Sequence, residues 1–253
     1  MEAPKITPIK PSTTEKKYKK IHPHLPQSNF VLSLNAPRAT GKSTLINWLM
    51  LHDTAFGQDY FSQNGVYIFS PTIEQDSSSR YLLERFNCDT MYSDAKLQKI
   101  IDSQKKFKKD EMPHICCIFD DCIGDASMKR NSLLTAFVTK SRHYNADIII
   151  SLQHFKSLPI VIRQNITDLC VGFPIPNKNM LLAIADEYGD NMEGGSEQFI
   201  KLYHEATEKT RYRFMYCKLR ENPIQIFTDF EKMIYPKKES NNMDVDIDSD
   251  EDD

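Results

Sequence analysis

The sequence lacks the features that would place it in a membrane or among secreted, disulfide-linked proteins. No stretch of about 18 apolar residues is present, so we expect no membrane span. Residues 1–5 lack the apolar run of a secretory signal, and the six cysteines include no C-x-x-C pair with zinc-finger spacing. We therefore expect reduced cysteines. Cys116, Cys117 and Cys170 lie in apolar runs and should pack as small hydrophobic side chains.

Charge is distributed unevenly along the 253 residues. The formal net charge is −3, yet residues 239–253 contain eight acidic side chains and no lysine or arginine. The rest of the chain is therefore mildly basic, which suits a polyanionic partner but is also ordinary for a soluble domain. We predict an arm at 1–28 that is rich in proline and lysine, a single domain at 29–236, and a disordered acidic tail at 237–253.

Apolar runs of strand length alternate with segments of helical spacing. The predicted strands are 30–34, 66–70, 114–119, 146–152 and 169–173, and the main predicted helices are 41–51, 77–86 and 128–144. Because the apolar runs lack a period of two, these strands should be buried on both faces of a largely parallel sheet. The expected fold is a doubly wound, three-layer α/β arrangement, with residues 211–218 as a late edge or antiparallel strand.

A phosphate-binding motif follows the first predicted strand. Residues 36–44 match G-x-x-x-x-G-K-[S/T] with alanine at the first glycine position. In such a loop, backbone N–H groups surround phosphate oxygens and the next helix directs its positive end toward them. The predicted nucleotide-binding residues are Ala36, Pro37, Arg38, Ala39, Thr40, Gly41, Lys42, Ser43 and Thr44. Among them, Lys42 should neutralise the β- and γ-phosphates of ATP, and Ser43 should offer its hydroxyl to Mg²⁺.

A strand that ends in two carboxylates is the second motif. Residues 114–119 are nearly all apolar and lead into Asp120 and Asp121. In P-loop NTPases, an aspartate at such a strand end holds the magnesium shell, and a carboxylate beside it orients or deprotonates the attacking water. We assign Asp120 to the Mg²⁺ shell and Asp121 to the water. Two aspartates at a strand end also serve as a helix cap, but their co-occurrence with the phosphate loop favours the catalytic interpretation.

Gln153 follows the apolar run at 146–152 and forms a third, weaker motif. A side-chain amide at the carboxyl end of a strand beside the loop strand is suited to sense the γ-phosphate and to position water. A glutamine at a strand end is usually just solvent-facing. The assignment therefore depends on the order of the three motifs along the chain: loop, aspartate pair, glutamine.

In this order, the motifs resemble those of the genome-packaging ATPases of large nucleocytoplasmic DNA viruses. The resemblance lies in residues 35–44, 118–121 and 141–153 and extends over about 29–227. The sequence is similar to the poxvirus packaging ATPase and to the wider FtsK/HerA group of DNA-pumping motors. The resemblance implies a P-loop NTPase fold and an ATP-driven, homo-oligomeric ring that moves double-stranded DNA into a preformed capsid. It also implies a capsid or portal component as partner, and a location in the host cytoplasm, at the viral factory, and in the virion.

Ring motors of this kind complete each site with an arginine from the neighbouring subunit, because charge on the transferred phosphoryl group needs a mobile cation. The candidates are Arg142, just before the run at 146–152, and Arg163, just after it. We favour Arg142 because it lies beside His143 in the segment that resembles the family. Either arginine could instead form an ordinary salt bridge.

Two other classes of protein use the same phosphate loop. A nucleoside or small-molecule kinase usually brings a lid with paired arginines, and the order of the aspartate and glutamine strands argues against that class. A non-motor nucleotide switch specific for guanine would carry Asn-Lys-x-Asp; residues 176–180 come closest but lack the aspartate. ATP turnover that rises with duplex DNA and ignores free nucleosides would separate the motor from both alternatives.

Overall fold

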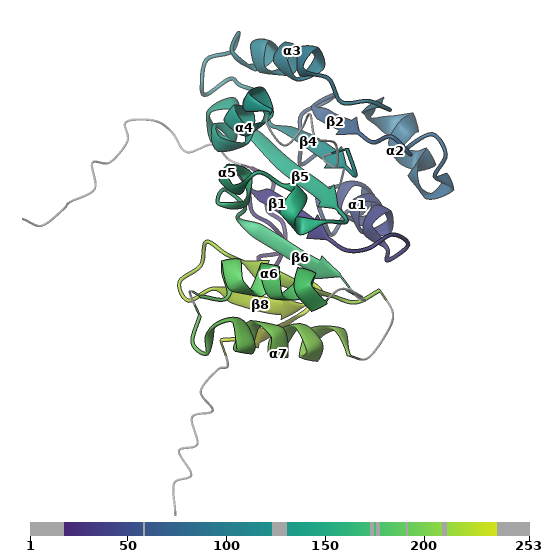
Figure 1. Ribbon diagram of the computed structural model, residues 1–253. Helices are drawn as coiled ribbons and strands as arrows, with labels where there is room; N and C mark the ends of the chain where they lie inside the picture. The colour runs from purple at the N-terminus through teal and green to yellow at the C-terminus, as the bar shows by residue number, and fades with distance from the viewer. Residues whose placement is uncertain are drawn as a thin grey trace, which may run out of the picture.

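The computed structural model describes residues 18–57, 59–122, 131–172, 175, 178–190, 192–208 and 212–236. The predicted acidic tail at 237–253 and residues 1–17 of the predicted arm lie outside these ranges. Within the described residues, every helix is too short or too polar to span a lipid bilayer. The described chain forms one nine-stranded sheet with helices on both of its faces (Figure 1).

The order of strands across the sheet is β3-β2-β4-β5-β1-β6-β7-β8-β9. The first six in this order run parallel: β3 (Asn87–Asp89), β2 (Val66–Phe69), β4 (Ile115–Asp120), β5 (Ala146–Leu152), β1 (Val31–Asn35) and β6 (Asp168–Gly172). The antiparallel strands that complete the sheet are β7 (Phe214–Lys218), β8 (Gln225–Thr228) and β9 (Lys232–Tyr235). The loop strand β1 therefore lies inside the sheet, between β5 and β6.

Two apolar clusters cover the two faces of the sheet. One face is covered by α1 (Lys42–Leu51) and α2 (Arg80–Arg85). The other is covered by α3 (Asp94–Gln104), α4 (Ser132–Thr139), α5 (Ile160–Arg163), α6 (Lys178–Tyr188) and α7 (Gly195–Thr207). All seven residues of β5 are buried, as expected for a strand covered on both faces. The arrangement confirms the predicted three-layer α/β fold with a largely parallel sheet.

Local sequence signals explain where several helices begin. Ser93 accepts a hydrogen bond from the backbone N–H of Lys96 at the start of α3, and Asn131 does the same for Leu134 at the start of α4. The predicted continuous helix at 128–144 is wrong in its described part. There α4 ends at Thr139, and a separate 3₁₀ segment, η3 (Ser141–Tyr144), leads into β5.

The described part of the predicted arm, residues 18–28, lies against the domain. The Tyr18 hydroxyl donates to Oδ1 of Asn145 at 2.7 Å, just before β5 begins. The Lys218 ammonium donates to the carbonyl oxygen of Pro23 at 2.7 Å, and the side chain of Leu25 is buried. These contacts attach the segment to the amino-terminal ends of the parallel strands.

Candidate nucleotide site

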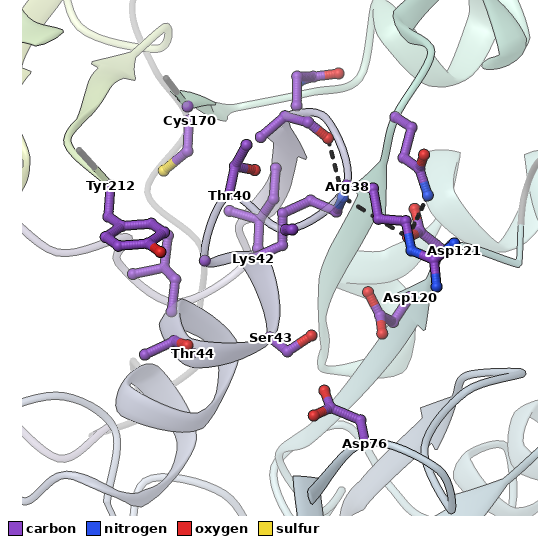
Figure 2. Close-up of a pocket in the computed structure, with 18 of the residues that line it drawn as sticks. Arg38, Thr40, Lys42, Ser43, Thr44, Asp76, Asp120, Asp121, Cys170 and Tyr212 are labelled. Carbon is purple, nitrogen blue, oxygen red and sulfur yellow. Dashed lines mark hydrogen bonds and ion pairs between the residues drawn. The ribbon is translucent and has the colours of Figure 1, made fainter. Parts of the chain in front are cut away.

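The carboxyl ends of β1, β5 and β4 meet at one edge of the sheet. Asn35 is paired with Leu152, and Ser151 is paired with Asp120, so the three strands end at the same level. One predicted motif follows or ends each strand. The three motifs line a shared cavity of about 1320 Å³ (Figure 2). Ligands of doubly wound sheets bind at this edge, outside the carboxyl ends of the strands.

The loop between β1 and α1 is held in a wrapped conformation. The Ala36 N–H donates to the carbonyl oxygen of Leu152 at 3.2 Å, and the Thr40 hydroxyl donates to that of Pro37 at 2.7 Å. Ala39 and Gly41 have φ angles of 59° and 92°, in the left-handed region. Gly41 adopts this region without steric cost and caps the start of α1, so the first N–H groups of that helix are available to an anion.

Alanine in place of the first motif glycine is matched by a glycine on the neighbouring strand. A Cβ atom placed on Gly172, at the end of β6, would lie only 2.7 Å from the Cβ of Ala36. The methyl group of Ala36 therefore fills space that the missing side chain of Gly172 leaves open. This pairing explains how the loop departs from the usual motif without a clash.

Lys42 points its ammonium group back into the loop. Nζ donates to the carbonyl oxygens of Ala36 and Pro37 at 2.9 and 3.1 Å, and it lies 3.7 Å from Oδ2 of Asp121. Only 8% of the side chain is exposed. The charge is thus held within the loop, where a β- or γ-phosphate would replace the carbonyl partners.

The two carboxylates at the end of β4 have different surroundings. Asp120 Oδ2 accepts a hydrogen bond from the Ser70 hydroxyl at 2.9 Å, and burial raises the pKa of Asp120 above its usual value. Asp121 has a φ angle of 48°, which ends the strand, and its N–H donates to the carbonyl oxygen of Ser151 at 3.0 Å. The Gln153 amide donates to Asp121 Oδ2 at 2.9 Å, so Lys42, Asp121 and Gln153 form one network.

Oxygen donors suited to magnesium lie beside this network. Ser43 and Asp120 line the same part of the cavity (Figure 2). The described residues contain no group of three or more His, Cys, Asp or Glu side chains placed to hold a metal ion. A hydroxyl and a single carboxylate nevertheless fit Mg²⁺, which commonly keeps several waters and is completed by the phosphates of its substrate.

The predicted arginines lie elsewhere. Arg142 is exposed in η3, before β5 begins, so the seven residues of β5 separate it from the loop edge by about 20 Å. Arg163 is paired within its own subunit: its Nη1 atom lies 3.1 Å from Oε2 of Glu187, and its guanidinium lies over the ring of Phe155. The structure therefore does not bring either predicted arginine into the cavity of its own subunit.

Three further side chains in the cavity carry functional chemistry, and two of them, Asp76 and Tyr212, were not predicted from the sequence. Arg38, expected only as a loop contact, is exposed and points toward Asp121 (Figure 2). It forms no hydrogen bond or ion pair with any residue that the structure describes. Asp76, from the segment before α2, and Tyr212, from the segment before β7, line the cavity from distant parts of the chain. No local motif marks Asp76 or Tyr212.

The chain is similar in sequence to known proteins. A family model described as "Poxvirus A32 protein" matches residues 57–216. The DNA packaging proteins OPG160 of Variola virus and of Vaccinia virus (strain Copenhagen) are each 38% identical to this chain over 74 residues. That stretch covers 29% of this chain and 26% of each relative, so the match spans about a quarter of their length.

The fold also resembles solved structures. B204, the DNA-packaging ATPase from Sulfolobus Turreted Icosahedral Virus, has a TM-score of 0.56 and 15% identity, over 80% of this chain and 98% of that chain. The genome packaging NTPase B204 from Sulfolobus turreted icosahedral virus 2, in complex with AMPPCP, has a TM-score of 0.50 and 17% identity, over 79% and 97%. At these identities the likeness shows a shared fold.

Proposed function

We propose that this chain, which belongs to the Poxvirus A32 protein family, is an ATP-hydrolysing motor that moves double-stranded DNA into a viral capsid. The observation that carries the ATPase assignment is the network of Lys42, Asp121 and Gln153 at the ends of three adjacent strands. The DNA assignment is supported by the relatives, which are named DNA packaging proteins, and by the family to which the chain belongs.

Each residue of the network has its own role in phosphoryl transfer. Lys42 exchanges its loop carbonyl partners for the β- and γ-phosphates and neutralises their charge. Asp121 orients the attacking water and accepts its proton, and Gln153 fixes the Asp121 carboxylate through the 2.9 Å hydrogen bond. Ser43 and Asp120 would hold Mg²⁺, which would supply positive charge beside the phosphates.

We propose that the subunits form a homo-oligomeric ring around duplex DNA and dock on a capsid or portal component. The ring would work in the host cytoplasm, at the viral factory, and accompany the capsid into the virion. Exposed Arg142, on the edge of the sheet opposite the loop, would then face the cavity of a neighbour.

ATP turnover, measured with and without linear duplex DNA, tests this proposal. We expect DNA to raise the rate, free nucleosides to leave it unchanged, and the samples that hydrolyse ATP to have the mass of a closed oligomer. Phosphate transfer to an added nucleoside would support a kinase instead. Nucleotide binding without hydrolysis, in the presence of DNA, would support a non-motor switch.

The cation that completes the site has three candidate sources: Arg142 or Arg163 of a neighbour, or Arg38 of the same subunit. Mixing the inactive variants Lys42→Ala and Arg142→Ala should restore ATPase if Arg142 acts in trans, because some sites then combine an intact loop with an intact arginine. Mixing Lys42→Ala with Arg38→Ala should restore nothing if Arg38 acts in its own loop. Arg163→Ala serves as the third partner, and dilution to monomers should abolish any rescue.

Restored activity with only the Arg38→Ala partner would reject a role for Arg38 within its own subunit. Absence of rescue with Arg142→Ala and Arg163→Ala, in rings shown to exchange subunits, would reject a trans arginine at either position. An arginine of this type is worth about 10³-fold or more in turnover, so even a few repaired sites would be measurable.

A further inference from the structure

An exposed tyrosine closes the end of the cavity that lies away from the aspartates. Tyr212 precedes β7, and 55% of the residue is exposed although it lines the same cavity as the phosphate loop. A Cβ atom placed on Gly41 would lie 3.5 Å from Cδ1 of Tyr212, so the ring is in van der Waals range of the loop. Figure 2 shows Tyr212 beside Thr44, on the opposite side of Lys42 from Asp121.

The backbone conformation that positions this ring is strained. Tyr212 has a φ angle of 78°, a left-handed conformation that bulky residues rarely adopt. The next residues are fixed: the Phe214 N–H donates to Oδ1 of Asp229 at 3.1 Å, and Arg213 pairs with the same carboxylate at 3.6 Å. Strained residues of this kind cluster where a side chain must be presented to a ligand.

Other aromatic side chains line the same cavity as Tyr212. Trp48 and Phe214 also line the cavity, and both rest on Phe230, with ring centroids 5.8 and 5.1 Å from it. The charged side chains of Asp120 and Asp121 lie on the opposite side of Lys42 from Tyr212 (Figure 2). The cavity therefore combines charged side chains suited to phosphates with aromatic side chains suited to a flat apolar group.

We propose that Tyr212 is the stacking surface for the base of the bound nucleoside triphosphate. This inference rests on the proposed ATPase function. With the phosphates at Lys42 and at the start of α1, the nucleoside leaves the loop on the side of Thr44, where Tyr212 lies. Stacking uses the π face that every base has and does not read its hydrogen-bonding edge. The site should therefore accept ATP and GTP with similar affinity.

Calorimetric titration can separate the base from the phosphates. The ligands are ATP, GTP and inorganic tripolyphosphate, which has the phosphates but no base. The proteins are the wild type, Tyr212→Ala, Tyr212→Phe and Tyr212→Gly, which removes the ring and relieves the left-handed backbone. Tyr81→Ala is the matched control, because Tyr81 is also exposed, at 67%, but lies on α2 outside the cavity lining. Trp48, the single tryptophan of the chain, lines the cavity and gives a second readout by its emission.

We expect Tyr212→Ala and Tyr212→Gly to weaken ATP and GTP binding about tenfold and to leave tripolyphosphate binding unchanged. Tyr212→Phe and Tyr81→Ala should bind all three ligands as the wild type does. Equal weakening of all three ligands would show that the ring only supports the loop through Gly41, and unchanged ATP binding would show that no base stacks there; either result overturns the inference. Wild-type protein that binds neither ATP nor tripolyphosphate would overturn the ATPase proposal itself.

Discussion

The two edges of the parallel sheet use aspartate in opposite ways. At the carboxyl edge, Asp121 lines an open cavity and shares one oxygen, Oδ2, with Gln153 and Lys42. At the amino edge, Asp147 is fully buried and accepts hydrogen bonds from the backbone N–H groups of Asn29 and Phe30, at 2.6 and 3.2 Å. A carboxylate that faces a cavity retains capacity to bind a ligand, whereas one saturated by its own chain acts as an anchor.

Histidine and tyrosine complete the anchors at the amino edge. Nε2 of His114 lies 2.9 Å from Oδ2 of Asp147, and its other ring nitrogen lies 3.0 Å from the Tyr60 carbonyl oxygen. On β6, two strands from β5, buried Asp168 accepts hydrogen bonds from the hydroxyls of Thr167 and Tyr216. Both anchors join segments that are far apart in sequence. The contrast predicts that substitutions in the network of Lys42, Asp121 and Gln153 change catalysis and that substitutions in the anchors of the amino edge change stability.

The largest effect should come from Lys42→Ala at the carboxyl edge. Without the ammonium group, the backbone N–H groups alone must neutralise the phosphates, so ATP hydrolysis should fall by about 10³-fold and ATP affinity should collapse. Steady-state hydrolysis and nucleotide titration measure both. Lys99→Ala, at an exposed position on α3, is the matched control. Hydrolysis at the wild-type rate in Lys42→Ala would show that the phosphate loop is wrongly assigned.

At the amino edge, His114→Ala should lower the free energy of unfolding by about 3 kcal/mol, because it leaves the buried Asp147 carboxylate without its side-chain hydrogen-bond partner. Urea unfolding measures the change, and exposed His143→Ala is the control. ATP turnover per folded molecule should stay at the wild-type value. A loss of turnover with unchanged stability would reverse the roles assigned to the two edges.

Asp121→Asn should lower ATP turnover by about 10²-fold, as expected when a general base is lost. The substitution keeps the shape of the side chain and the Mg²⁺ shell, so ATP binding and the free energy of unfolding should remain close to the wild-type values. ATP turnover, nucleotide titration and urea unfolding, measured on the same sample, test this prediction. An equal loss of ATP affinity would instead place Asp121 among the structural or metal-binding residues.

Gly172→Ala should have the smallest effect, a loss of about 1–3 kcal/mol in stability from overpacking against Ala36. The double variant Ala36→Gly with Gly172→Ala should recover most of that loss, because it removes the opposing methyl group. Unfolding of both variants, with Ala36→Gly alone as the control, forms a double-mutant cycle. Additive effects in this cycle would mean that the two positions do not interact.

The sequence was sufficient to predict the central strands and the order in which the phosphate loop, the aspartate pair and Gln153 follow them. A long, β-branched run such as 146–152 can bury all of its side chains only in a sheet that is covered on both faces. The parallel order of the strands then brings the carboxyl ends of β1, β4 and β5 together. The late strand at 211–218 proved to be antiparallel β7, with β8 and β9 beyond it. The roles assigned to individual site residues remain predictions.

Other elements gave weaker or nonlocal signals. No sequence pattern predicted helices α6 and α7 or the strands β3, β8 and β9, which are only three or four residues long. Helix α3 was also missed, although its buried residues Leu97, Ile100 and Ile101 have helical spacing after the capping Ser93. Tyr212 reaches the loop through the pairing of β7 with β6, which no local pattern reveals.

Movement along duplex DNA, powered by hydrolysis at the carboxyl edge, is tested most directly by displacement of a third strand. A triplex-forming oligonucleotide is bound near one end of a linear duplex, and its release is followed after addition of protein and nucleotide. We predict release with the wild type and ATP, and none with Lys42→Ala or with the non-hydrolysable analogue AMPPCP. A wild-type protein that hydrolyses ATP on this DNA but leaves the oligonucleotide bound would contradict the motor.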